Sequence, residues 1–281
     1  MTSHSPVLIE YAFEQSQRYQ KRYRTIYLSN TYGAVRVMQD WSWAQISADI
    51  NTTTIATSPG TSLPKVRVYF EDREAYDFFH ALMYRQPMKK CTTPLSDVTL
   101  GCSNYLQLIG KGIPEFSRCS IVCLDGDQDA PKFKTVVLLP GALPPDQLIF
   151  EHLYNLGPEQ DYWKNDLQFT RMVFTNAASE VINTFGITGN VVDLRERLDS
   201  YTGPKTPREV FKEFYKNEQM QQVLISGTKP YNPWKHWIDT HPEQTNDYLD
   251  RMHAALLGVM QKGFGVDATK LQSLGVTHKK T

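Results

Sequence analysis

The sequence predicts a mixed α/β fold with a mostly parallel β-sheet flanked by helices. Two short runs rich in β-branched residues, 65–72 and 120–124, each lead into carboxylates and lie far enough apart for a helical crossover. Apolar residues at helical spacing follow the first run, and an apolar run at 135–139 precedes another helical pattern. Strands that alternate with helices are typical of a parallel sheet.

The chain begins with a different pattern. Residues 10–24 have helical character, and the runs 25–29 and 34–38 flank Asn30–Gly33, which predicts a β-hairpin. Residues 51–64 are rich in Thr and Ser and contain Gly60 and two prolines, which is typical of a linker. We therefore expect a small β-containing segment over residues 1–60, followed by a domain boundary.

The central part, residues 65–190, carries the predicted sheet. Helical spacing continues from Ala75 to Met83, a short strand is expected at 97–101, and a short helix is expected at 104–111. The run 120–124 is uniformly apolar from its second residue, as in a strand buried on both faces. After 135–139, Pro145 suits the first turn of a helix that ends near Gly157.

Residues 191–281 are expected to form a helical C-terminal region. Thr206 and Glu209 form a capping box around Pro207, and helical periodicity returns at 246–262.

Composition limits the function classes. The chain has 281 residues with 41% hydrophobic residues, enough for a sizeable core. Lys+Arg and Asp+Glu are both 30, so any phosphate-binding surface must be local or assisted by metal. The four cysteines include no Cys-x-x-Cys pair, and no signal peptide or membrane-length apolar run is present. We expect a cytoplasmic protein with reduced cysteines and no membrane partner.

The acidic strand ends are the main candidate site. Asp125 and Asp127 are two residues apart on an extended chain, so both side chains point beyond the strand end. Gly126 between them has no side chain to crowd a ligand. Glu71 ends the earlier strand and should meet them if the two strands are neighbours. Carboxylates brought together repel one another unless a proton or cation lies between them, and Mg²⁺ or Mn²⁺ prefers such oxygen ligands.

This arrangement resembles a known family. A Glu at the end of one strand and an Asp-x-Asp at the end of a later one is similar to the Toprim pattern of topoisomerases, primases and related nucleases. Residues 68–75, 124–127 and 138–145 resemble the overcoming-lysogenisation-defect (OLD) nucleases more closely. The resemblance covers residues 65–157 well and the remainder weakly.

The resemblance implies a metal-dependent endonuclease that hydrolyses phosphodiester bonds of DNA, as a homodimer and in anti-phage defence. Glu71, Asp125 and Asp127 would hold one or two Mg²⁺ or Mn²⁺ ions. Asp129 and Glu74 lie near these acids in the sequence and would complete the metal shell. By the resemblance, the family also uses a downstream acid and a lysine near the phosphate, for which Glu151 and Lys212 are the candidates, with Lys205 behind Lys212.

The same family predicts an ATPase partner. Ser-His-Ser-Pro at residues 3–6 is similar to the switch-histidine segment of ABC-type ATPases, which precede the Toprim part in OLD nucleases. No Gly-x-x-x-x-Gly-Lys-Ser/Thr loop is present, so this chain should not hydrolyse ATP by itself. We expect either the C-terminal part of an ATPase–Toprim protein or a short relative that works with a separate ATPase. The alternative is that His4 is an ordinary polar residue near a terminus.

Each candidate residue also has a structural interpretation. Glu71 could cap its helix, and residues 125–129 could form a solvated turn. Glu74 and Glu151 suit a helix surface, and Lys212 lies beside Glu209 and Glu213 as on a solvated helix face.

Other functions stay open. A haloacid-dehalogenase-like phosphatase or a sugar-nucleotide transferase also uses Asp-x-Asp, although neither explains Glu71. A non-catalytic Toprim scaffold of a defence complex is a further alternative. A calcium EF-hand is excluded, because its sixth and twelfth loop positions are Ala130 and Val136.

Overall fold

The computed structural model describes residues 12–13, 26–29, 36–38, 46, 63–129, 132–266, 271–272 and 274–275. Contacts divide the chain into two compact units, Met1–Lys65 and Val66–Thr281. Apart from Lys65, the second unit contains both the predicted sheet region, 65–190, and the predicted helical region, 191–281. His4, most of the helix expected at 10–24 and most of the linker at 51–64 lie outside the described residues.

The described part of the first unit includes the expected pair of strands. β1 (Tyr27–Ser29) runs antiparallel to β2 (Arg36–Met38), with Leu28 opposite Val37. This antiparallel pairing confirms the strands of the predicted hairpin, while its turn lies outside the described residues.

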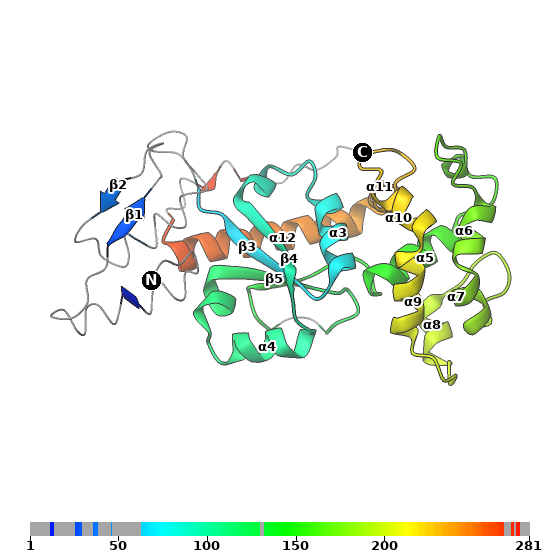
Figure 1. The fold of residues 1–281 in the computed structure, drawn as a ribbon, viewed down its shortest axis with the longest axis horizontal. Coiled ribbons are helices and arrows are strands. Elements are labelled where there is room, and N and C mark those ends of the chain that lie inside the picture. Colours follow the sequence, from blue (N-terminus) through cyan, green and yellow to red (C-terminus); the bar gives the residue numbers. More distant parts are fainter. Residues whose placement is uncertain are drawn as a thin grey trace. The chain divides into compact units, whose positions relative to one another are not determined.

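The second unit is built on a four-stranded sheet in the order β4–β3–β5–β6. Figure 1 labels three of these strands, β3, β4 and β5. The strands are β3 (Val66–Phe70), β4 (Thr92–Thr99), β5 (Ser120–Leu124) and β6 (Val136–Leu138). Every neighbouring pair is parallel, so the predicted α/β fold class is confirmed. All residues of β5 are buried, as expected for a central strand.

The strand expected at 97–101 is the one whose bounds differ most from the prediction. β4 begins at Thr92 and ends at Thr99. Pro94 lies inside it, and a proline usually argues against a strand because it cannot donate a ladder hydrogen bond. β4 is an edge strand, paired with β3 on one side only, so Pro94 is tolerated there.

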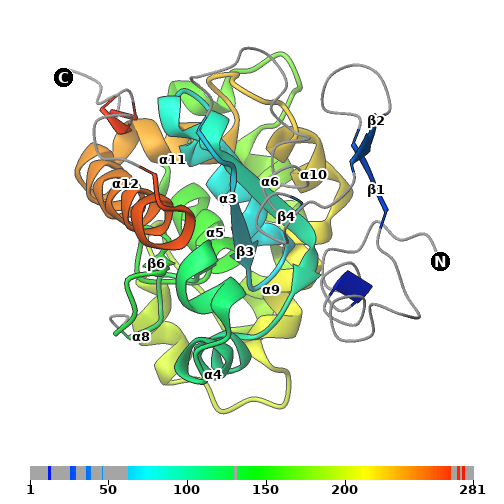
Figure 2. The same ribbon diagram turned by 90° about the vertical axis from the view of Figure 1, so that its left-hand side faces the viewer.

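Helices cover the sheet on different sides (Figure 2). Phe70 and Cys123 are aligned on neighbouring strands. Phe70 packs on Phe79 of α3 (Arg73–Leu82), with ring centroids 5.0 Å apart, and the Cys123 sulfur lies 3.9 Å from the Tyr248 hydroxyl of α12 (Pro242–Phe264). On the other face, α4 (Cys102–Gly110) contributes side chains to a core cluster with residues of β3, β5 and β6. The sheet core is therefore closed on both faces.

The remaining helices of the second unit lie in its C-terminal part. They are α5 (Pro145–Asn155), α6 (Arg171–Ala177), α7 (Ser179–Thr184), α8 (Leu194–Asp199), α9 (Pro207–Lys216), α10 (Glu218–Leu224) and α11 (Pro233–Thr240). Short 3₁₀ turns at Pro87–Cys91 and Asp161–Trp163 and a π turn at Glu115–Cys119 complete the unit. Of the helices that the structure describes, none has both the length and the apolar character needed to cross a bilayer.

Aromatic packing fixes α9 against α5. The Phe150 ring of α5 meets the rings of Phe211 and Phe214 of α9 edge-on, with centroids 5.4 and 5.5 Å apart. At the start of α9, Thr206 accepts a hydrogen bond from the Glu209 backbone N–H, and its hydroxyl donates to the Glu209 carboxylate at 2.7 Å. Thr206 is therefore the N-cap of α9, as predicted, and the Glu209 carboxylate bonds to its hydroxyl. The fixed position of α9 determines where Lys212 lies.

A partly buried histidine pair contributes acid sensitivity to the fold. His152 of α5 lies 2.9 Å from His236 of α11 between ring nitrogens, and burial together with His236 and His241 lowers the pKa of His152 to about 3. Histidines in the unfolded chain titrate near pH 6.5, so the unfolded state binds more protons between these values. We expect His152 to reduce the free energy of unfolding by about 2 kcal/mol between pH 7.5 and pH 5. Urea unfolding of His152→Gln should show a change in the free energy of unfolding between pH 7.5 and pH 5 that is about 2 kcal/mol less unfavourable than that of wild type. The same change in both proteins would contradict the lowered pKa of His152.

Candidate functional site

The ends of β3 and β5 meet as predicted. The Glu71 carboxylate accepts a hydrogen bond from the backbone N–H of Asp125 at 3.0 Å through one oxygen. Its other oxygen accepts from the backbone N–H of Cys102, at the start of α4, at 3.2 Å. Glu71 therefore joins the ends of two parallel strands and the first turn of a helix. It is half-buried, and its expected convergence with Asp125 is confirmed.

Asp72, rather than Glu71, caps the helix that follows. One Asp72 carboxylate oxygen accepts from the backbone N–H of Ala75 at 3.0 Å, which is the N-cap interaction of α3. The capping interpretation of Glu71 is wrong, because both of its oxygens face other elements. Two consecutive acids thus have separate roles at this junction.

Lys212 reaches this junction from α9. Its ammonium nitrogen lies 2.6 Å from an Asp72 oxygen and 2.6 Å from a Glu74 oxygen. The Lys212 side chain is 19% exposed, so its interpretation as part of a solvated helix face is wrong. Glu74, which also suited a helix surface, is 4% exposed. Lys205 is elsewhere, paired with Glu180 on the surface.

Asp146 is a member of the site that sequence reasoning missed. It is 2% exposed, lies in the first turn of α5, and places an oxygen 3.9 Å from the Lys212 nitrogen. Its place after β6 carried a signal, because β6 is the next strand of the sheet beyond β5. An acid in the helix turn that follows a third parallel strand lies at the edge of the sheet where the carboxyl ends of the other two strands lie.

We define the acidic cluster as Lys212 together with six carboxylates, those of Glu71, Asp72, Glu74, Asp125, Asp127 and Asp146.

Two other predicted residues have different surroundings. Asp129 is exposed, as in a turn. Glu151 lies five residues beyond Asp146 on α5, which turns it by about 140° around the helix axis. Its carboxylate accepts from the backbone N–H of Leu194 at 2.7 Å, so the structure does not bring Glu151 to the acidic cluster.

The exposure of the two loop aspartates differs sharply. Asp125 is 7% exposed, and its Oδ1 is buried without a hydrogen-bond partner among the described residues. Asp127 is exposed and accepts a hydrogen bond from the Gln128 side chain at 2.9 Å. A buried carboxylate oxygen without a donor is costly unless it is protonated or bound by a cation.

The electrostatics of the cluster favour protons or cations. Burial, followed by repulsion from Asp72 and Glu71, raises the pKa of Asp125 well above its usual range. Burial also raises the pKa of Asp146 to about 6, although Lys212 opposes this shift. Burial lowers the pKa of Lys212, but Asp146 and Asp72 outweigh it and raise the pKa overall, so Lys212 stays charged. The cluster holds more negative charge than Lys212 neutralises.

The donor set fits a hard divalent cation, because carboxylate oxygens are the ligands that Mg²⁺ and Mn²⁺ prefer. The partnerless Asp125 oxygen is the clearest single indication. In the described part of the chain, no three Asp, Glu, His or Cys side chains are grouped closely enough to hold one ion as they stand. Ion binding would therefore require carboxylates such as the exposed Asp127 to turn about their side-chain bonds.

Gly126 allows the loops after β5 and β6 to touch. A Cβ atom at Gly126 would lie 2.4 Å from the Gly141 carbonyl oxygen and 2.9 Å from that of Leu139. Both obstacles are backbone atoms, so we expect Gly126→Ala to lower the free energy of unfolding by about 2–4 kcal/mol. Urea unfolding should show this loss, whereas Gly157→Ala, with no atom near its added Cβ, should have a much smaller effect. Equal stability of Gly126→Ala and wild type would contradict the close approach.

Comparisons with protein-family models, curated proteins and solved structures find no match to this chain. The Toprim and OLD assignment therefore stays a prediction from the motifs. The functional argument depends on the geometry and charge of the acidic cluster.

Proposed function

We propose that this chain is a Mg²⁺- or Mn²⁺-dependent endonuclease of Toprim type that hydrolyses phosphodiester bonds in nucleic acid, with DNA as the expected substrate. The observation that supports this proposal is the convergence of acids at the carboxyl ends of β3 and β5 and after β6, with Lys212 among them. That edge of a parallel sheet is where α/β enzymes bind ligands.

Asp125, Asp127 and Glu71 would hold the cation. Asp125 contributes a buried oxygen that lacks a donor, and Asp127 contributes a carboxylate on the solvent side. Glu71 fixes the Asp125 backbone, which positions the loop that carries both aspartates. When bound, one or two such ions supply an activated water and neutralise charge on the scissile phosphate.

Lys212 would bind the substrate phosphate. It is a charged ammonium held by carboxylates, and a lysine contacts phosphate as a compact point charge. The carboxylates of Asp72 and Glu74 hold it by ion pairs of 2.6 Å, and that of Asp146 lies 3.9 Å away. The carboxylates of the cluster alone would repel nucleic acid, so Lys212 and the cation together make phosphate binding favourable.

The direct test uses the purified chain with supercoiled plasmid, linear DNA and transfer RNA. Each substrate is incubated with Mg²⁺, Mn²⁺ or chelator, and a small phosphomonoester is assayed in parallel. Nicking or cleavage that requires a cation supports the proposal. Phosphate release from the monoester without plasmid cleavage would instead favour the phosphatase alternative. Absence of both cation binding by calorimetry and cleavage would favour a non-catalytic scaffold.

An ATPase domain or subunit, a homodimer and a role in anti-phage defence remain predictions from the family resemblance. A cleavage assay with and without a candidate ATPase tests the ATPase partner. Sedimentation analysis of the purified chain tests the homodimer.

A further inference from the structure

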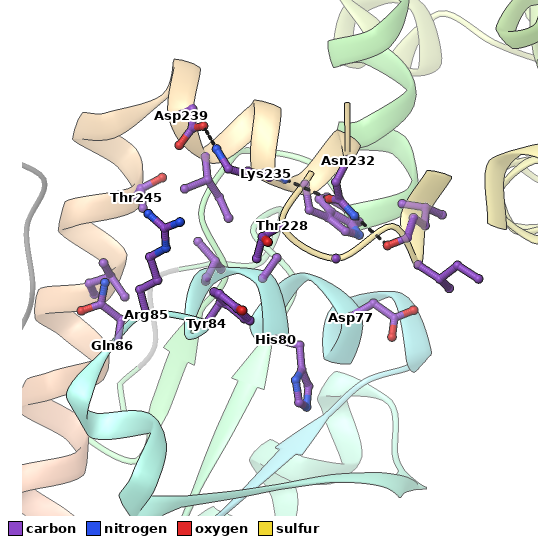
Figure 3. A pocket seen from close by; sticks show the side chains of 18 of the residues that line it. Asp77, His80, Tyr84, Arg85, Gln86, Thr228, Asn232, Lys235, Asp239 and Thr245 are labelled. Carbon is purple, nitrogen blue, oxygen red and sulfur yellow. Dashed lines mark hydrogen bonds and ion pairs between the residues drawn. The ribbon is translucent and has the colours of Figure 1, made fainter. Parts of the chain in front are cut away.

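A cavity lies between α3, α11 and the start of α12 (Figure 3), and none of the side chains of the acidic cluster lines it. Its volume is about 560 Å³, within the range of small-molecule sites. The wall includes Leu82, Trp234, Ile238 and Leu249. Leu82, Trp234 and Leu249 are almost fully buried, at 3%, 2% and 2% exposure, so this wall is a firm part of the core. It suits the flat or apolar body of a ligand.

Three residues that line this cavity carry a buried polar atom without a hydrogen-bond partner among the described residues: Thr245 (Oγ1), His80 (Nε2) and Trp234 (Nε1). Thr245, in the first turns of α12, is 6% exposed, and its side-chain oxygen is buried without a hydrogen bond among the described residues. Its backbone N–H already donates to His241 at 3.1 Å, so only the hydroxyl is available. A buried hydroxyl without a partner has a free-energy cost, which a ligand with an acceptor atom would remove.

A cation lies beside this hydroxyl. Figure 3 shows Arg85, just beyond the end of α3, extending toward Thr245. Two other cations of the cavity wall are already paired, Lys235 with Asp239 and Arg73 with Asp77. Within the described part of the chain, Arg85 makes no ion pair, so its guanidinium remains available. The positive end of the α12 dipole adds to the attraction for an anion at this place.

We propose that this cavity binds a small organic anion, with its ring or apolar body against Trp234 and Ile238 and its anionic group between Arg85 and Thr245. Arg85 would donate two hydrogen bonds to a carboxylate, sulfonate or phosphate, and Thr245 a third. The site is independent of the proposed nuclease function, because it shares none of the acidic cluster's side chains.

The probe is 8-anilino-1-naphthalenesulfonate, compared with N-phenyl-1-naphthylamine, which has the same rings without the sulfonate. Titration calorimetry and fluorescence with the folded chain should show saturable binding of the sulfonate, at least about tenfold tighter than the uncharged probe. Arg85→Gln should weaken sulfonate binding about tenfold and leave the uncharged probe unaffected. Thr245→Val, which keeps the side-chain shape, should weaken it several-fold.

Arg195→Gln is the matched control, because Arg195 is exposed on α8 and does not line the cavity. It should bind both probes as wild type does. Thermal unfolding of each variant checks that the fold is retained, as expected for the exposed Arg85 and for loss of an unpartnered hydroxyl. Equal affinity for the two probes, or sulfonate binding unchanged in both variants, would overturn the proposal. Competition by adenosine 5′-monophosphate or indole-3-acetate then separates nucleotides from aromatic carboxylates as the natural class.

Discussion

Asp125→Asn is expected to reduce cation-dependent cleavage about a thousandfold or more while raising the free energy of unfolding at pH 8. Activity should fall because the substitution removes the buried anionic oxygen that would hold the ion, and the ion contributes several kcal/mol to catalysis. Stability should rise because the side chain keeps its size but loses a charge surrounded by like charges. The amide can also donate a hydrogen bond to a neighbouring carboxylate.

This combination separates a functional acid from a structural one. Plasmid cleavage with Mg²⁺ or Mn²⁺ and urea unfolding without cations should be measured on the same preparations. Asp127→Asn should lose activity with little change in stability, because Asp127 is exposed. Asp166→Asn, an exposed acid outside the cluster, is the control and should change neither quantity. Wild-type cleavage by Asp125→Asn would remove the metal assignment.

The cluster also gives the stability a pH dependence whose sign can be stated. The pKa of Asp146 is raised to about 6 by burial, so between about pH 4 and pH 6 the folded state binds more protons than the unfolded state. Its contribution therefore favours folding at low pH and is lost as the pH rises through 6. Asp125 acts in the same direction. A divalent cation should restore stability above pH 7 if it binds the folded chain alone.

The sheet could be predicted because its signals are local. The β-branched run of β5, the helical spacing after Glu71 and the turn chemistry around Pro145 each specify an element without knowledge of the rest of the chain. The convergence of Glu71 and Asp125 followed from the general rule that neighbouring parallel strands end at one edge. The first part of β4 could not be predicted, because Pro94 argues against a strand unless that strand lies at an edge of the sheet. The sequence alone does not show that β4 is an edge strand.

The positions of Lys212 and Asp146 could not be predicted, because they depend on contacts between segments that are distant in the sequence. Lys212 is 140 residues from Asp72, and its local neighbours Glu209 and Glu213 predict a solvated face. Only the packing of α9 on α5 turns it toward the cluster. Asp146 illustrates a different difficulty, because the family resemblance places the downstream acid at Glu151 on the same helix. The helix turn separates these two side chains, and only Asp146 faces the strand ends.

Lys212→Ala is expected to lower the free energy of unfolding by about 3–5 kcal/mol at pH 8, because it leaves buried carboxylates without their cation. The nearest are Asp72 and Glu74, and Asp146 is the most deeply buried of the three. The loss should be smaller at pH 5, since Asp146, with its pKa raised to about 6, is then protonated. Urea unfolding at the two pH values measures this difference. Lys205→Ala, which breaks a surface pair, should leave stability nearly unchanged at both.

A double-mutant cycle tests whether the loss arises from the unpaired acids. Asp146→Asn removes one of the charges that Lys212→Ala leaves unpaired, so the double variant should be less destabilised than the sum of the two single variants. Additive losses would mean that Lys212 stabilises the fold through its aliphatic stem rather than its charge. Cleavage provides the second readout. If Lys212 binds phosphate, the double variant should regain stability without regaining activity, whereas a purely structural lysine predicts that both recover together.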